Sequence, residues 1–272
     1  MPNVRSSPLA GKWYPGKADQ LAESVDAYLK EAATPKVDGQ LIGVVAPHAG
    51  HMYSGGVAAY AFSAVRGVEV DVVAIIGPMH SAVSSRLLTT GHDAYWTPLG
   101  EVPVDRDGLA AVQAACEIPM TPIFNDPEHS LEIELPFLQR VLKSFTLIPI
   151  MMRDDSPAAC LAVGKALAIA LQGRRHLLVA SSDLSHFYPQ TIAERLDNYM
   201  LAQVESFDPL AVLQAEDEGK GFACGRAPIA AVLTAAKQLG GTQVKVVKYA
   251  TSGDVSGDYN SVVGYGAALI WK

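Results

Sequence analysis

The chain has 272 residues, of which 49% are hydrophobic and 18% charged, so it is long enough to bury a sizeable core. Its net charge of −7, without any basic stripe, excludes a general nucleic-acid binder, because contacts to phosphate need clustered lysine and arginine. The apolar runs are well short of the roughly 18 residues of a membrane helix, and no basic-then-apolar signal segment precedes them. We therefore expect a cytoplasmic protein with a single α/β domain over residues 1–272.

The first expected elements are a loop and a helix. Residues 5–16 contain two proline-centred turns and an aromatic pair, Trp13 and Tyr14, suited to covering a pocket. Asp19 then opens an amphipathic helix, which we expect to pack on a sheet. The apolar side of this helix carries Leu21, Val25, Tyr28 and Leu29.

Two apolar runs each lead to a histidine. Residues 41–46 predict a strand buried on both faces, which Pro47 ends because proline cannot donate to a ladder, and His48 follows. Residues 72–76 repeat the pattern and lead through Gly-Pro-Met to His80. Open α/β sheets place ligands beyond the carboxyl ends of their strands. The sequence therefore predicts that two imidazoles meet at one edge of a sheet.

The next segments alternate between helices and strands. A Gly-rich stretch at 53–57 leads into a helix with small residues, which allow it to approach strands closely. The expected elements are a helix at 58–62 that ends by Gly67, a strand at 86–90, an irregular stretch at 91–103 and a helix at 105–116 capped by Asp105.

Residues 126–138 begin with the signature of a helix start. Asp126 suits the cap position and Pro127 the first helical position. On such a helix His129 and Glu132 would lie three positions apart on one face. His129 is then either part of an active site together with Glu132 or a surface residue of the capping region.

A third apolar run leads to an acid and a histidine. Asp183 and His186 are suited to an acid/base pair, because an imidazole near its free pKa can carry protons at neutral pH. Alternatively, Ser182 and Asp183 cap a following helix whose first turn contains His186. The expected elements around them are a strand at 145–151, a helix at 156–172, a strand at 176–181 and helices at 188–207 and 209–218.

Three widely spaced cysteines predict neither a disulfide framework nor a Cys-x-x-Cys zinc site. We expect Cys116 and Cys160 to be buried apolar residues. Cys224 directly precedes Gly225 and an Ala-rich helix that runs to Leu239. A helix N-terminus lowers the pKa of a thiol and favours the thiolate that binds metals, so Cys224 is a candidate ligand.

The last two strands are expected at 244–251 and 262–270, joined by a polar stretch at 252–260 that is either a flexible lid or a simple link. The repeated order of strand and helix predicts an α/β fold, a three-layer sandwich whose mostly parallel central sheet has helices on both faces. Of the remaining histidines, we expect His51 and His92 in loops or at the surface and His176 to be structural.

Two imidazoles and one thiolate or carboxylate make a site with open coordination positions, as catalytic metals have. Such a set suits Fe(II), and it suits zinc equally; a cysteine ligand also admits copper. The sequence contains no phosphate loop, no G-x-G-x-x-G after a strand and no G-x-S-x-G elbow. ATP, dinucleotide and serine-hydrolase functions are therefore disfavoured.

Five motifs, in this order, resemble one family. The motifs are Ala46-Pro47-His48-Ala49-Gly50, Gly77-Pro78-Met79-His80, Glu128-His129-Ser130-Leu131-Glu132, Ser181-Ser182-Asp183-Leu184-Ser185-His186 and Cys224-Gly225-Arg226-Ala227-Pro228-Ile229. Together they resemble the Memo family, named for mediator of ErbB2-driven cell motility, whose prokaryotic members are called AmmeMemoRadiSam system protein B. The similarity covers nearly the whole chain.

This resemblance implies a fold like that of the class III, LigB-type extradiol dioxygenases, which open catechol rings with non-haem Fe(II) and dioxygen. It assigns His48, His80 and Cys224 to the metal triad and places Asp183 and His186 in the same pocket, His186 matching the acid/base histidine of those enzymes. Cys224 departs from them, because they have a carboxylate ligand there. The family name also links the chain to AMMECR1-type and radical S-adenosylmethionine proteins as partners.

We therefore expect an iron-dependent, oxygen-using oxidoreductase that acts on a phenolic or related small molecule. In it His186 moves a proton, Asp183 orients His186, and His129 lies opposite. Two alternatives stay open. One is a zinc-type hydrolase on the same ligands, with His186 or Glu132 as the base. The other is a metal-binding or partner-binding module that keeps the pocket without its chemistry.

Overall fold

The centre of the protein is a set of four parallel, buried strands. The computed structural model describes residues 3–33 and 36–272. Neighbouring strands pair parallel in the spatial order β2, β9, β3, β8. Their apolar side chains are covered on both faces, as the uninterrupted apolar runs predict. These strands are β2 (Leu41–Ala46), β9 (His176–Ser181), β3 (Val72–Pro78) and β8 (Thr146–Met152).

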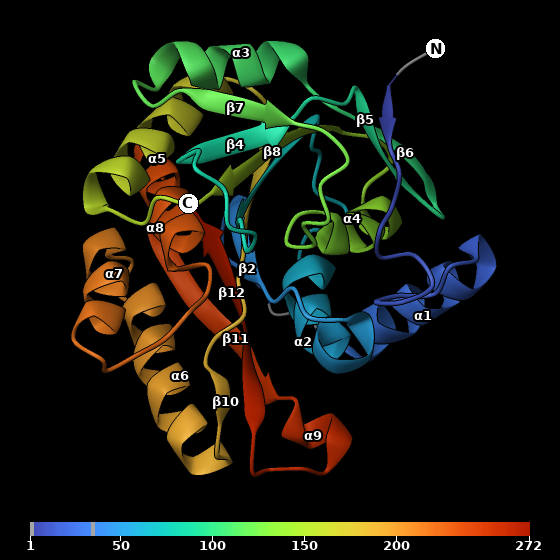
Figure 1. The fold of residues 1–272 in the computed structure, drawn as a ribbon, viewed down its shortest axis with the longest axis vertical. Helices are drawn as coiled ribbons and strands as arrows, with labels where there is room; N and C mark the ends of the chain where they lie inside the picture. The colour runs from blue at the N-terminus through green and yellow to red at the C-terminus, as the bar shows by residue number, and fades with distance from the viewer. Residues whose placement is uncertain (1–2, 34–35) are drawn as a thin grey trace.

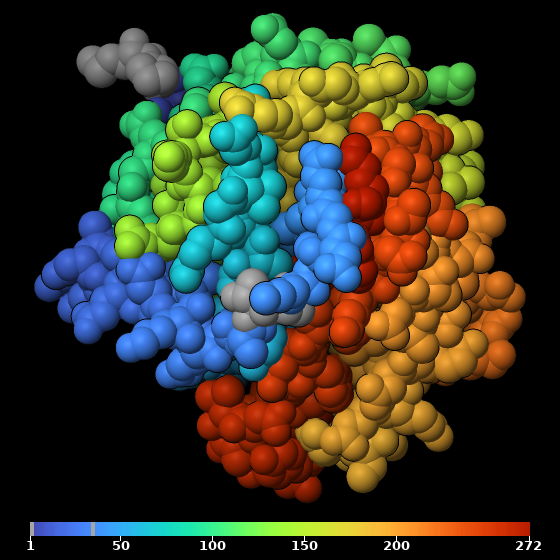
Figure 2. All heavy atoms as spheres, turned by 180° about the vertical axis from the view of Figure 1, so that it is seen from behind, coloured from blue at the N-terminus to red at the C-terminus, as the bar shows by residue number. Residues whose placement is uncertain are grey.

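Antiparallel strands extend the sheet on both sides, to nine strands within the described residues. On one side β12 pairs antiparallel with β2, and both β10 and β11 pair antiparallel with β12. On the other side β4 pairs antiparallel with β8, and β7 parallel with β4. Figure 2 shows the chain around β2 beside the red C-terminal strand, although the two come from opposite ends of the sequence. These outer strands are β12 (Val262–Trp271), β10 (His186–Tyr188), β11 (Gln243–Thr251), β4 (Leu87–Thr90) and β7 (Met120–Ile123).

Helices cover both faces of the sheet, which confirms the predicted three-layer α/β fold (Figure 1). One layer contains α1 (Ala18–Glu31), α2 (His51–Ser63) and α4 (Leu135–Val141). The other contains α3 (Arg106–Ala115), α5 (Pro157–Leu171), α6 (Gln190–Glu205), α7 (Pro209–Asp217) and α8 (Arg226–Gln238).

Small residues set the spacing within the second layer. The helices α5 and α8 approach so closely that a Cβ added at Gly164 would lie 2.5 Å from the Cβ of Thr234. In the first layer α1 packs through Leu21, Val25 and Leu29, as its apolar periodicity predicts. Its main partners are the helices α2 and α4, so the expectation that it packs on a sheet is wrong. Within the described residues, no helix has both the length and the apolar character needed to cross a bilayer.

Several segments differ from the sequence-based expectation. The stretch expected to be irregular, 91–103, forms the hairpin of β5 (Ala94–Thr97) and β6 (Gly100–Pro103), on which β1 (Val4–Arg5) adds a third strand. The helix expected from residue 58 begins earlier, at His51, and ends at Ser63, before Gly67. The alternative that put His186 in a helical turn is wrong, because His186 begins β10.

The helix start expected at Asp126 is also wrong. Residues 126–129 have no regular structure and residues 130–131 form a turn, followed by the short helix η1 (Glu132–Glu134) and then α4. The carboxylate of Asp126 accepts a local hydrogen bond from the backbone N–H of Glu128 at 3.1 Å, but both of its oxygens also bind the buried Arg5 of the N-terminal strand. A tertiary contact therefore overrides a local capping signal.

Candidate metal centre

Three candidate ligands from distant parts of the chain meet beyond the carboxyl edge of the sheet. His48 follows β2, His80 follows β3, and Cys224 directly precedes Gly225 and α8. One ligand atom from each lies within 4.8 Å of the other two, and His48 Nε2 is 3.1 Å from Cys224 Sγ. The structure thus brings the three residues together as the sequence predicts.

Hydrogen bonds fix the orientation of both imidazoles. His48 Nδ1 lies 2.9 Å from Ser181 Oγ, whose own hydrogen is directed to backbone and carboxylate acceptors. His80 Nδ1 lies 2.9 Å from a carboxylate oxygen of Glu128, which can only accept. Both rings therefore carry the proton on Nδ1. This leaves each Nε2 lone pair available to a metal.

Glu128 is a functional residue that the sequence reasoning did not single out for chemistry. Its carboxylate also accepts hydrogen bonds from the backbone N–H groups of His80, His129 and Ser130. Burial alone would raise the pKa of Glu128, but the donors from His80 and Ser130 outweigh it and hold the pKa well below its usual value. Glu128 thus stays ionised and holds His80 in place.

His129 lies beside the two histidine ligands. Its ring stacks on His80 with centroids 4.5 Å apart, and its centroid is 5.2 Å from that of His48. The ring of Trp13 also packs against His129, with centroids 4.4 Å apart. Of the aromatic pair expected over a pocket, Trp13 therefore lines the cavity, whereas Tyr14 is buried outside it. Burial lowers the pKa of His129 to about 4, which keeps the ring neutral. His129, Glu128 and His80 also form a second group with the spacing of a metal site.

Glu132 is not in the pocket, and its expected pairing with His129 on one helical face is wrong. Its carboxylate is fully buried and accepts hydrogen bonds from Arg5, Ser7 and Tyr14. Arg5 is 1% exposed and also donates to the backbone carbonyl of Glu128. This network fixes the segment that presents Glu128 and His129 to the centre.

Asp183 supports the loop that carries His48. One carboxylate oxygen accepts from the backbone N–H of His48 at 2.8 Å, and the N–H of Ala49 is a second donor. Burial raises the pKa of Asp183 to about 7. His186 Nδ1 instead donates to the carbonyl of Leu184 at 2.8 Å, so the expectation that Asp183 orients His186 is wrong.

Cys224 differs from the expectation in its pKa. Burial, followed by the negative charge of Asp183, raises the pKa of the thiol, although the residue precedes a helix. A bound cation would reverse this balance, because a coordinating thiol loses its proton. The neighbouring Gly225 is required by close packing, since a Cβ there would lie 2.6 Å from the carbonyl oxygen of Ser181.

The remaining histidines and cysteines lie outside the centre. His51 and His92 are each 2% exposed, so neither is a surface residue. His92 does lie in a loop, between β4 and β5, whereas the expectation of a loop position is wrong for His51. His51 lies at the start of α2, with Nε2 3.0 Å from the carbonyl of Ile133. His176 begins β9 as predicted. The other two cysteines, Cys116 and Cys160, are buried, as predicted.

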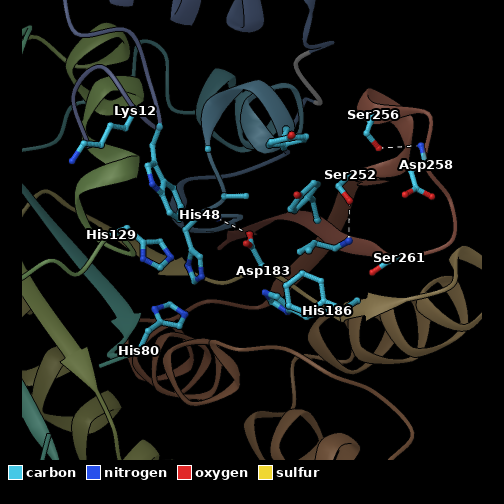
Figure 3. A pocket seen from close by; sticks show the side chains of 17 residues that line it. Lys12, His48, His80, His129, Asp183, His186, Ser252, Ser256, Asp258 and Ser261 are labelled. Carbon is cyan, nitrogen blue, oxygen red and sulfur yellow. Dashed lines mark hydrogen bonds between the residues drawn. The ribbon is translucent and has the colours of Figure 1, made fainter. Parts of the chain in front are cut away.

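A cavity of about 660 Å³ opens beside the ligands (Figure 3). We call the part lined by His48, His80, His129 and Asp183 its inner end. The outer end is lined by residues of the link between β11 and β12, namely Ser252, Ser256, Asp258 and Ser261. In Figure 3 these two groups lie on opposite sides of the view, with His186 between them.

Comparisons with known proteins match this chain to one family. The model of the family described as "Memo-like protein" matches residues 5–269. A MEMO1 family protein of Methanococcoides burtonii is 38% identical, with 98% of this chain and 100% of the relative covered. One from Pyrobaculum aerophilum is 33% identical, with 99% of each chain covered. A crystal structure of an uncharacterized protein from Escherichia coli K12 matches in fold, with a TM-score of 0.53, 14% identity and coverage of 85% of this chain and 100% of that one. The chain therefore belongs to the Memo-like family.

Proposed function

We propose that this protein is a non-haem, metal-dependent oxidoreductase that uses dioxygen to oxidise a phenolic small molecule. His48, His80 and Cys224 would hold the metal, with Fe(II) as the native ion. The observation that carries the proposal is the convergence of two oriented Nε2 atoms and one sulfur beside an open cavity. Three protein ligands leave the remaining positions for substrate and dioxygen.

The donor set fits such an ion. Both imidazoles are held with Nδ1 protonated, so neither Nε2 needs to lose a proton before it binds. Burial, with a smaller contribution from the neighbouring imidazoles, holds the pKa of His48 well below its usual value. When bound, Fe(II) would polarise the phenolic oxygen and supply the electrons that activate dioxygen.

His186 is the base in this proposal. Burial lowers the pKa of its imidazole, and the bond from Nδ1 to Leu184 leaves Nε2 without a proton. Because His186 lines the cavity, Nε2 can accept the proton that a phenol releases. Trp13 and His129 form the wall against which an aromatic ring would stack.

Metal binding is tested first, on protein purified without oxygen. We expect Cys224→Ala to reduce the affinity for Fe(II) by about 100-fold or more, because it removes one of three ligands. Cys160→Ala is the matched control, since that thiol is buried within α5 and outside the cavity. Equal metal affinity in the two variants would exclude the proposed centre.

Oxygen uptake with a series of catechols tests the reaction. We expect uptake in step with substrate loss, and His186→Ala should abolish it while metal content stays unchanged. Activity that persists without oxygen would instead favour a hydrolase on the same ligands, with zinc as the ion. Tightly bound metal without any turnover would favour a binding module.

A further inference from the structure

The outer end of the cavity has a chemistry of its own. Figure 3 shows Ser252, Ser256, Asp258 and Ser261 together on the side away from the imidazoles. Ser256 Oγ accepts from the backbone N–H of Asp258 at 3.1 Å and keeps a second lone pair. The outer end therefore presents hydroxyl and carboxylate oxygens to a ligand.

The carboxylate of Asp258 has no cationic partner in the described part of the chain. One of its oxygens accepts from the backbone and side-chain nitrogens of Asn260, at 2.9 and 3.0 Å. Among the residues that line the cavity, the only lysine or arginine is Lys12, which in Figure 3 lies on the same side of the view as His129 and away from Asp258. The outer end thus carries an uncompensated negative charge.

Aromatic rings from three elements also line the cavity. They are Tyr53 from α2, Tyr265 from β12 and Phe187 from β10. Phe187 is 74% exposed, which gives it little stabilisation from packing. Its ring is nevertheless held in the lining of the cavity, next to His186 at 5.7 Å.

The backbone of Phe187 is strained to hold that position. Its φ of 64° lies in the left-handed region, which residues other than glycine rarely adopt. The residue sits in an irregular step of the β10–β12 ladder, between the paired residues His186 and Tyr188. Such bulges re-aim a side chain beside binding sites. Phe207 shares the conformation but is only 8% exposed, so packing offsets its cost.

We propose that the outer end binds a protonated amine on the substrate. Aromatic faces and one unpaired carboxylate are the groups that recognise an ammonium ion, and the serine oxygens can accept its hydrogens. The amine would lie between Asp258 and the ring of Phe187. The inference rests on the proposed function in one respect only: the catechol group, at the other end of the ligand from the amine, is placed at the inner end of the cavity.

Two pairs of probes test this site by calorimetric titration. Dopamine and dihydrocaffeate share a catechol ring and a two-carbon spacer, but the first ends in an ammonium and the second in a carboxylate. Phenethylamine and hydrocinnamate form the same pair without the chelating hydroxyls. Protein loaded with Zn²⁺, which is redox-inert, and metal-free protein are compared at physiological ionic strength.

We expect each amine to bind more tightly than its matched acid, by about tenfold or more. Asp258→Asn should remove most of this preference. Because the whole chain carries a charge of −7, amines also gain from its general field. The control is Asp254→Asn, which removes the same charge from the same link but does not touch the cavity, and it should keep the preference.

The outcomes separate this inference from the proposed function. Equal binding of amine and acid, no binding of either amine, or an unchanged preference in Asp258→Asn would overturn the amine site. If both catechols gain equally from Zn²⁺ without a preference, the metal centre stands and the amine site fails. If phenethylamine is preferred but dopamine gains nothing from Zn²⁺, the amine site stands and the metal centre fails.

Discussion

The two ends of the cavity are built differently. At the inner end, His48 and His80 are each held by a buried hydrogen-bond acceptor. At the outer end, Phe187 in a bulge and Asp258 in a surface link are exposed to solvent. The inner end is built on the carboxyl ends of parallel strands, which the core holds rigidly. The outer end is built on connections between antiparallel strands. The inner end is thus a preorganised centre, whereas the residues of the outer end can be replaced, and the bound molecule changed with them, without disturbing the fold.

The buried ion network under the inner end should show the largest effect. Arg5→Met leaves the carboxylates of Asp126 and Glu132 without their cation. We expect the free energy of unfolding to fall by about 3–5 kcal/mol, as when one partner of a buried ion pair is removed. Urea unfolding measures this loss. Arg140→Met breaks an exposed pair with Asp26 and should cost at most about 1 kcal/mol. Similar costs in the two variants would contradict the role given to Arg5.

Removing the charge of Glu128 tests whether the inner end depends on its hydrogen-bonded support. Glu128→Gln keeps the size of the side chain but weakens the hold on His80 Nδ1. We expect the affinity for Zn²⁺ or Fe(II) to fall by about 10–100-fold, the usual effect of losing a partner of a ligating histidine. Competition with a chromophoric chelator measures it. Glu69→Gln, in an exposed pair with Arg175, should leave the affinity unchanged. An unaltered affinity in Glu128→Gln would mean that Glu128 does not position His80.

The acid sensitivity of metal-free protein probes the helix below the inner end. Burial lowers the pKa of His51 to about 4, against about 6.5 when unfolded, so the unfolded state binds more protons between these values. The contribution of the neutral, buried His51 to the free energy of unfolding is therefore fully present above pH 6.5 and is lost as the pH falls toward 4. The loss at pH 5 amounts to about 2 kcal/mol.

The measurement compares wild type with His51→Phe by urea unfolding at pH 8 and pH 5. At pH 8 both proteins are uncharged at this position, so the difference there gives the combined effect of packing and of the lost hydrogen bond to Ile133. The difference should shift by about 2 kcal/mol in favour of the variant at pH 5. A difference that does not change with pH would show that His51 does not titrate as a buried group.

The inner end could be predicted from local sequence because its ligands follow strands that are themselves strongly patterned. The apolar runs before His48 and His80 and the glycine after Cys224 each have a local physical cause. The support of these ligands could not be predicted in this way. Arg5 reaches Asp126 across 121 positions and cancels a capping signal. No local pattern records such a contact.

Burial of single polar residues was equally hidden from the sequence. His51 looked like a loop residue because the glycines after it suggested a later helix start, yet α2 begins at His51 itself. The raised pKa of Cys224 also depends on how deeply the fold encloses it, which periodicity does not show. The outer end gave the weakest signal, because the link at 252–260 was predicted only as a lid or a simple connection. It contains the short helix α9 (Gly253–Ser256) and lines the cavity.

The smallest expected effect tests whether strain at the outer end serves binding. Phe187→Gly removes the cost of the left-handed conformation and loses little packing, so we expect the free energy of unfolding to rise by about 1 kcal/mol. The same variant should bind dopamine more weakly, since the ring that would face the ammonium is gone. The matched control is Tyr188→Gly, one position further along β10, where glycine in a strand should lower stability. If Phe187 served stability alone, the protein would lose stability in Phe187→Gly. A gain in stability together with a loss of amine affinity would instead show that the bulge is kept for the ligand.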